Sequence, residues 1–230
     1  MTDLVAPACL SFIDHELIAP GLMRSCCRYQ PEQFDDDSFT VAGIQAPPSV
    51  SDAALKRKTE YLAGRWCARE GLKHLGFNGT PQQQADRSPR WPDGSVGSIT
   101  HSHGVAEALV ADKKKWRAVG IDSEVWLDPE RADRLCHQLL TRSEYESLAG
   151  QDPLSRARRI SEIFSAKESL FKALYPLTGK RFYFHDAETD KEGNITLLID
   201  LSASWTAGTG LAVTYLPGNS HIMTRICLPA

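Results

Sequence analysis

Two long segments of helical periodicity, one in each half of the 230-residue chain, constrain most strongly what this sequence can fold into. Residues 51–76 contain no proline, repeat large apolar side chains at helical intervals and end at Gly76, as a long helix does. The second segment, residues 155–176, is predicted to stop before Pro176. Segments of alternating polarity adjoin both. We therefore predict an α/β chain of the α+β type, in two similar halves divided near Lys115.

Short alternating segments predict strands around the two helices, and the turn at residues 112–115 predicts a hairpin between the second and third of them. Residues 1–50 predict surface loops with one or two strands, and residues 78–97, rich in proline and glycine, predict a loop. Two short helices are predicted at 127–140 and 141–150. The predicted strands are 97–102, 105–112, 116–124, 181–188, 194–201, 210–216 and 221–228.

Composition excludes several classes of protein. With 42% apolar and 24% charged residues the chain can bury a core, which argues against disorder. Its net charge of −3 gives no basic excess for a general nucleic-acid binder. No stretch is long and apolar enough for a membrane span, and the start lacks the pattern of a signal peptide, so the expected location is the cytoplasm. The six cysteines form no CxxC pair and are predicted to be reduced thiols.

Three carboxylates have the spacing of a hard-cation site. Asp122 and Glu124 lie two residues apart at the end of a predicted strand, so both point from one face. Glu168 lies in the second long helix, and carboxylates gathered from a strand and a helix suit magnesium. A solvated strand end and an ordinary helical Glu would give the same pattern. Likewise, Lys172 follows Glu168 by four residues and could form a plain surface ion pair or face phosphates.

Basic side chains gather on the first long helix. Arg57, Arg65 and Arg69 recur at intervals of eight and four, which makes one stripe. Such a stripe is either a solvated face or a phosphate site built from planar guanidinium groups. His101 and His103 end the strand that follows, but no third zinc-type ligand is near them in the sequence, so an anion-binding or core role is favoured.

Four motifs, in order, give the chain a family resemblance: GRWCARE at 64–70, WPDGSVGSITHS at 91–102, GIDSE at 120–124 and FSAKESLFKAL at 164–174. Together they resemble the 4′-phosphopantetheinyl transferases of the type that includes the bacterial siderophore-synthesis enzymes. The resemblance covers roughly residues 50–180. Two departures, Phe164 where many relatives carry Trp and Ser123 where an apolar residue is commoner, remove no ligand.

The resemblance implies an enzyme of the holo-(acyl-carrier-protein) synthase type, which transfers the 4′-phosphopantetheine arm of coenzyme A to a serine of an apo acyl or peptidyl carrier protein. Adenosine 3′,5′-bisphosphate would be released. By this resemblance Asp122, Glu124 and Glu168 hold magnesium on the pyrophosphate, and Lys172 contacts the phosphates. Glu168, close to both metal and nucleophile, is the best candidate for the general base. The carrier protein and its pathway are not specified by the motifs.

The resemblance also implies the substrate side of the site and the architecture. Arg57, Arg65, Thr100 and His101 would hold the 3′-phosphate and adenine of coenzyme A. The family fold is a pair of pseudo-twofold-related halves, each a long helix on a small, mostly antiparallel sheet. Residues 1–115 would form the coenzyme A half and residues 116–230 the magnesium and transfer half, and a monomer is expected. A non-catalytic coenzyme A or nucleotide binding protein and a magnesium-dependent phosphohydrolase are the alternatives.

Overall fold

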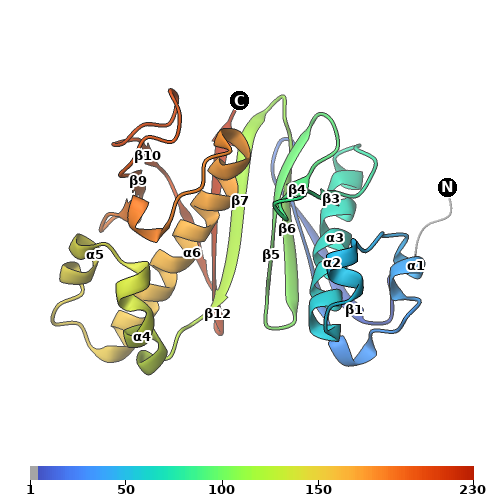
Figure 1. The fold of residues 1–230 in the computed structure, drawn as a ribbon, viewed down its shortest axis with the longest axis horizontal. Coiled ribbons are helices and arrows are strands. Elements are labelled where there is room, and N and C mark those ends of the chain that lie inside the picture. The colour runs from blue at the N-terminus through green and yellow to red at the C-terminus, as the bar shows by residue number, and fades with distance from the viewer. Residues whose placement is uncertain (1–4) are drawn as a thin grey trace. The chain divides into compact units, whose positions relative to one another are not determined.

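The computed structural model describes residues 5–230, which divide into two compact units. The first unit runs to Val119 and includes Leu228–Ala230, and the second is Gly120–Cys227. Each unit combines one long helix with antiparallel strands (Figure 1), which confirms the predicted fold class. The prediction about the start of the chain extends over residues 1–4, which lie outside the described range. Within that range no helix is both long and apolar enough to cross a membrane.

The first unit is a four-stranded antiparallel sheet covered by α3 (Leu55–His74). The sheet order is β1 (Leu10–Ala19), β2 (Leu22–Tyr29), β6 (Val105–Asp112) and β5 (Ser95–Ser102). Leu62, Trp66 and Leu72 of α3 are buried at 3% exposure or less, so this helix and the sheet share one core. Shorter elements complete the unit: η1 (Pro31–Gln33), α1 (Ser38–Ala42), α2 (Pro48–Ser51), β3 (Gln82–Gln83) and β4 (Pro89–Arg90).

The second unit is built around α6 (Pro153–Thr178). Asp152 caps the start of this helix by accepting hydrogen bonds from the N–H groups of Leu154 and Ser155, and Gly179 ends it with φ 63°. One sheet has the order β11 (Thr214–Pro217), β12 (His221–Pro229) and β7 (Trp116–Val125); another has β10 (Gly210–Leu211), β9 (Ile195–Leu197) and β8 (Ala187–Thr189). The remaining elements are α4 (Pro129–Leu139), α5 (Arg142–Ser147) and η2 (Phe184–Asp186).

The predicted hairpin across residues 112–115 is wrong. β6 pairs with β2 on one side and β5 on the other, whereas β7 pairs with β12 in a different sheet. Both hydrogen-bonding edges of β6 are therefore occupied, and β7 has no free edge of β6 to join. The turn instead leads the chain from one sheet to the next.

One other sequence prediction needs correction. α6 does not stop before Pro176 but continues to Thr178, because proline near a helix end removes only one backbone hydrogen bond. The Gly179 N–H still bonds to the Tyr175 carbonyl. By contrast, the prediction of one or two strands in the first fifty residues is confirmed by β1 and β2, although the pairing of β1 shifts register between Ser11 and Asp14.

Candidate active site

Asp122 and Glu124 lie on β7 and Glu168 and Lys172 on α6, and the structure brings the two motifs together. Gly120 of β7 faces α6, and because alternate residues of a strand share a face, Asp122 and Glu124 face the same way. The Lys172 Nζ donates to Asp122 Oδ1 over 2.6 Å. The Asp122 side chain is only 4% exposed and that of Lys172 25%, so neither is the solvated group that the simpler interpretation requires.

The charges of Asp122 and Lys172 affect the pKa values of the other two carboxylates, Glu124 and Glu168. Burial, followed by the negative charge of Asp122, raises the pKa of Glu124 to about 7, while Lys172 acts in the opposite direction. Burial also raises the pKa of Glu168, with Lys172 lowering it and Asp122 raising it further. Three carboxylates thus lie near Lys172, with Arg131 also acting on Glu124, so acidic groups outnumber basic ones in these partly buried surroundings. We call Asp122, Glu124, Glu168 and Lys172 the carboxylate cluster.

The carboxylate cluster is not a closed metal cage. Among residues 5–230, no group of three or more His, Cys, Asp or Glu side chains is assembled for a metal ion. Its oxygen-only donors nevertheless match the chemistry of magnesium, which usually takes one or two protein carboxylates and completes its shell with water and substrate phosphates. The donor set therefore fits magnesium together with a phosphate ligand better than magnesium alone.

The predicted anion-binding residues lie on α3 and β5 of the first unit. Arg57 Nη1 is 3.2 Å from His101 Nε2. Glu60 Oε2 lies 3.8 Å from both Arg57 Nη1 and His101 Nδ1, so one carboxylate contacts both members of the pair. Thr100, the neighbour of His101 on β5, is 4% exposed. Sequence reasoning missed Glu60, although its position one helical turn after Arg57 was a usable signal.

Arg65 is a buried guanidinium. The residue is 6% exposed, and its Nε is a buried atom without a hydrogen-bond partner among the described residues. The guanidinium carbon lies 4.8 Å from the centre of the Tyr61 ring. Burial lowers the pKa of Arg65, because the charged form loses hydration. A buried cation with an unused donor is well suited to bind an anion.

The third arginine of the stripe has a different role. Arg69 donates from Nη1 to the carbonyl of Ala42, at the end of α1, and its guanidinium carbon lies 4.4 Å from the centre of the Trp66 ring. Arg69 thereby connects two helices of the first unit. The role of Arg69 therefore differs from the one predicted for Arg57 and Arg65, although their spacing in the sequence places all three in one stripe.

Lys167, beside Glu168 in the sequence, is not part of the carboxylate cluster. Its ammonium is buried and donates to Glu144 Oε2 at 2.6 Å and to the carbonyl oxygens of Leu139 at 3.0 Å and Phe184 at 2.7 Å. Glu144 also accepts from the N–H and hydroxyl of Thr189. This pair links α6 with α4, α5, η2 and β8. No sequence pattern predicts it, because two of the three acceptors of Lys167 are backbone carbonyls.

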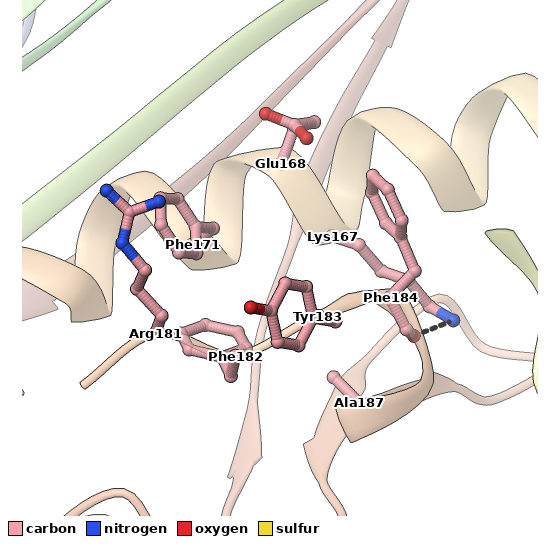
Figure 2. Close-up of a pocket in the computed structure, with 8 residues that line it drawn as sticks. All are labelled: Lys167, Glu168, Phe171, Arg181, Phe182, Tyr183, Phe184 and Ala187. Atoms are coloured by element: carbon pink, nitrogen blue, oxygen red, sulfur yellow. Dashed lines mark hydrogen bonds between the residues drawn. The ribbon is translucent and has the colours of Figure 1, made fainter. Parts of the chain in front are cut away.

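A cavity of about 220 Å³ lies beside α6. Figure 2 shows aromatic rings along it, with Arg181 toward one end and the Lys167–Phe184 hydrogen bond toward the other. Glu168 is also among the lining residues, but its carboxylate points to the other side of α6 from Phe182 and Tyr183 in Figure 2. The lining residues are Lys167, Glu168, Phe171, Arg181, Phe182, Tyr183, Phe184 and Ala187.

Two family models match most of the chain. The model for the 4'-phosphopantetheinyl transferase N-terminal domain matches residues 46–111, and the model for the 4'-phosphopantetheinyl transferase superfamily matches residues 118–222. The two matches fall on opposite sides of the turn at 112–115. They contain all four motifs and every predicted site residue.

Several curated proteins are similar along most of their length. The 4'-phosphopantetheinyl transferase Svp of Streptomyces mobaraensis is 36% identical over 78% of this chain and 79% of its own. The 4'-phosphopantetheinyl transferase PptT of Mycobacterium tuberculosis is 35% identical over 70% of this chain and 72% of its own. Enterobactin synthase component D of Escherichia coli (strain K12) is 38% identical over 61% of this chain and 68% of its own.

Proposed function

Because the chain belongs to the 4′-phosphopantetheinyl transferase superfamily, we propose that it moves the arm of coenzyme A onto a serine of an apo acyl or peptidyl carrier protein. The reaction is magnesium-dependent and releases adenosine 3′,5′-bisphosphate. The observation that carries this proposal is the carboxylate cluster, in which Lys172 bonds to Asp122 at 2.6 Å beside Glu124 and Glu168. Since all the residues required belong to one chain, the enzyme is proposed to act as a monomer.

The bond changes define what the residues must do. The serine Oγ of the carrier loses its proton and forms a bond to the β-phosphorus of coenzyme A. The bond from that phosphorus to the bridging oxygen breaks, and adenosine 3′,5′-bisphosphate leaves with the electron pair. Glu168 is the proposed proton acceptor, directly or through water, because its carboxylate lies in the same cluster as Lys172, where the phosphates are proposed to bind.

Negative charge on the pyrophosphate must be held while this exchange occurs. Lys172 supplies a fixed positive charge, and Asp122 orients its ammonium through the 2.6 Å bond. Asp122, Glu124 and Glu168 would hold magnesium. The ion, when bound, supplies further positive charge to the phosphate oxygens. The excess negative charge of the carboxylate cluster supports this assignment, because it favours a cation.

The first unit supplies groups for the other end of coenzyme A. Arg57, Arg65 and His101, with Thr100 beside them, are proposed to bind the 3′-phosphate and adenine. The unused Nε of buried Arg65 and the short contact between Arg57 and His101 support this role. Glu60 is proposed to hold Arg57 and His101 in place.

The cavity beside Glu168 is proposed to take the pantetheine arm. Its walls include Phe171, Phe182 and Tyr183, which suit a chain of methylene and amide groups. The cavity and the carboxylate cluster both adjoin α6, so the arm is proposed to reach the cluster past this helix.

The proposed activity is tested by mass spectrometry of an apo carrier protein incubated with the enzyme, coenzyme A and magnesium. Transfer adds the mass of the phosphopantetheine arm to one serine of the carrier. A carrier of unchanged mass with intact coenzyme A would favour the binding-protein alternative. Cleavage of coenzyme A with an unchanged carrier would favour the phosphohydrolase.

A further inference from the structure

Gly120 of β7 packs directly on the backbone of α6. A Cβ atom at this position would lie 1.9 Å from the Ser169 carbonyl oxygen and 2.9 Å from the Ala173 backbone nitrogen. Neither atom belongs to a side chain that could rotate away, so any other residue would push the strand and the helix apart. Gly120 therefore sets how closely β7 approaches α6.

Three buried hydroxyl groups hold α6 on the neighbouring strand. Ser165 Oγ lies 2.9 Å and Ser169 Oγ 2.8 Å from Thr224 Oγ1 of β12, and Ser169 also donates to the Thr224 carbonyl at 3.0 Å. All three residues are fully buried. Apolar contacts tolerate sliding, whereas hydrogen bonds weaken steeply when their geometry changes. This network thus fixes α6 along the sheet as well as against it.

The same two segments carry the carboxylate cluster. Asp122 lies two residues from Gly120 on the same face of β7. On α6, Ser169 follows Glu168 and precedes Lys172 by three residues, and the bond from Lys172 to Asp122 spans the two elements. Any shift of α6 relative to β7 changes this distance directly.

We propose that Gly120, Ser169 and Thr224 are positioning residues for the transfer reaction. They contact neither substrate nor metal in this account, but they set the spacing of β7 and α6 that brings Asp122 to Lys172 and Glu168. The proposal rests on the proposed function, since it concerns the alignment of its reacting groups. A purely structural role would lower stability without a selective effect on turnover.

The main test compares two serines of the same helix that both lose a buried hydroxyl. Ser169→Ala removes the bonds to Thr224. Ser161→Ala, the matched control, removes a bond to the Ala157 carbonyl and one from the Leu127 N–H, two turns away from the site. Both variants lose comparable hydrogen bonding, so their melting temperatures should fall by similar amounts. We expect Ser169→Ala to lower kcat by roughly tenfold with a much smaller change in KM for coenzyme A, and Ser161→Ala to keep kcat near the parent value.

Gly120→Ala provides a stronger perturbation. A displacement of about 1 Å can lower turnover by about 100-fold, which is the loss expected in kcat if this variant folds. Gly97→Ala is its control, because Gly97 is also a strand glycine under close contact, with a Cβ position 2.5 Å from the Trp91 ring, but lies in the first unit. Gly97→Ala should lower the melting temperature and leave kcat within a few fold of the parent.

The outcomes separate the two proposals. If Ser169→Ala and Ser161→Ala lose stability equally and both retain parental kcat, the positioning role is overturned while the transfer function stands. A parent protein that transfers nothing would overturn both. If Gly120→Ala fails to fold, the Ser169→Ala and Ser161→Ala comparison still decides.

Discussion

The two units contain the same combination of elements, one long helix on an antiparallel sheet, but they attach the helix in opposite ways. Where α3 meets the sheet of the first unit, the glycines are on the helix: a Cβ on Gly64 or Gly71 would meet a side-chain methyl group, Ile99 Cγ2 or Val110 Cγ2, at 2.7 Å. In the second unit the glycine is on the strand, and Gly120 meets helix backbone. A side-chain methyl group can shift more readily than helix backbone, so the contact in the second unit leaves less room for adjustment.

The units also differ in the sign of their unbalanced charge. The first presents Arg57 and a buried Arg65 with an unused donor, which favours an anion. The second presents three carboxylates near Lys172, with Arg131 also acting on Glu124, and this excess of acidic groups favours a cation. Each unit thus favours a ligand group of the opposite charge, through a different physical interaction.

The largest expected effect is on stability. Lys167→Met would leave Glu144 buried without its cation. We therefore expect the free energy of unfolding, measured by urea denaturation, to fall by about 3–5 kcal/mol. Lys180→Met serves as the control, because this exposed lysine donates only to the Asp200 carbonyl and should change stability by less than about 0.5 kcal/mol. Equal losses of stability in both variants would show that the buried pair of Lys167 and Glu144 stabilises the second unit no more than an exposed lysine does.

Next in size is the effect of Asp122 on chemistry. Asp122→Asn keeps the shape but loses the charge that orients Lys172 and would hold magnesium, so kcat should fall by about 10²–10³-fold. The steady-state rate of transfer to an apo carrier measures this loss in kcat. Asp133→Asn, at an exposed aspartate, is the control. Because Asp122 is buried, some loss of stability should accompany the loss of rate, unlike the case of a solvated strand end. Full activity of Asp122→Asn would contradict the proposed roles of Asp122 in orienting Lys172 and holding magnesium.

Arg65 tests the anion preference of the first unit. Arg65→Ala should lower the affinity for coenzyme A by tenfold or more, because charge-assisted hydrogen bonds contribute about 1.5–3 kcal/mol. Its affinity for dephospho-coenzyme A, which lacks the 3′-phosphate, should fall much less. Lys73→Ala is a control from the same helix, because it removes an exposed positive charge from the last turn of α3. Titration calorimetry with the two ligands measures the difference. Equal losses for both ligands would assign Arg65 to the fold.

The smallest effect concerns Glu60. Glu60→Gln removes the carboxylate that lies 3.8 Å from Arg57 and His101, contacts of the kind that contribute up to about 1 kcal/mol. We expect the affinity for coenzyme A to fall by only a few fold, with kcat unchanged. A loss as large as that of Arg65→Ala would make Glu60 a direct ligand rather than an orienting group.

Periodicity and spacing predicted the elements that carry the site, but not how those elements are held together. The helices that became α3 and α6 and the strand carrying Asp122 and Glu124 followed from local patterns that survive in the fold. The pairing of β7 with β12 did not, because strand partners depend on which edges are already occupied. Lys167 and Gly120 were also missed, since their contacts are to distant backbone atoms that no local spacing reveals.

We propose that a cation-assisted transfer cleaves coenzyme A, attaches the phosphopantetheine arm to the carrier and releases the nucleotide. The most direct measurement is the ratio of adenosine 3′,5′-bisphosphate released to modified carrier formed, quantified together with magnesium and after its removal by a chelator. We predict one nucleotide per modified carrier with magnesium, and neither product without it. Nucleotide released without modified carrier, or transfer that continues at full rate after metal removal, would contradict the account.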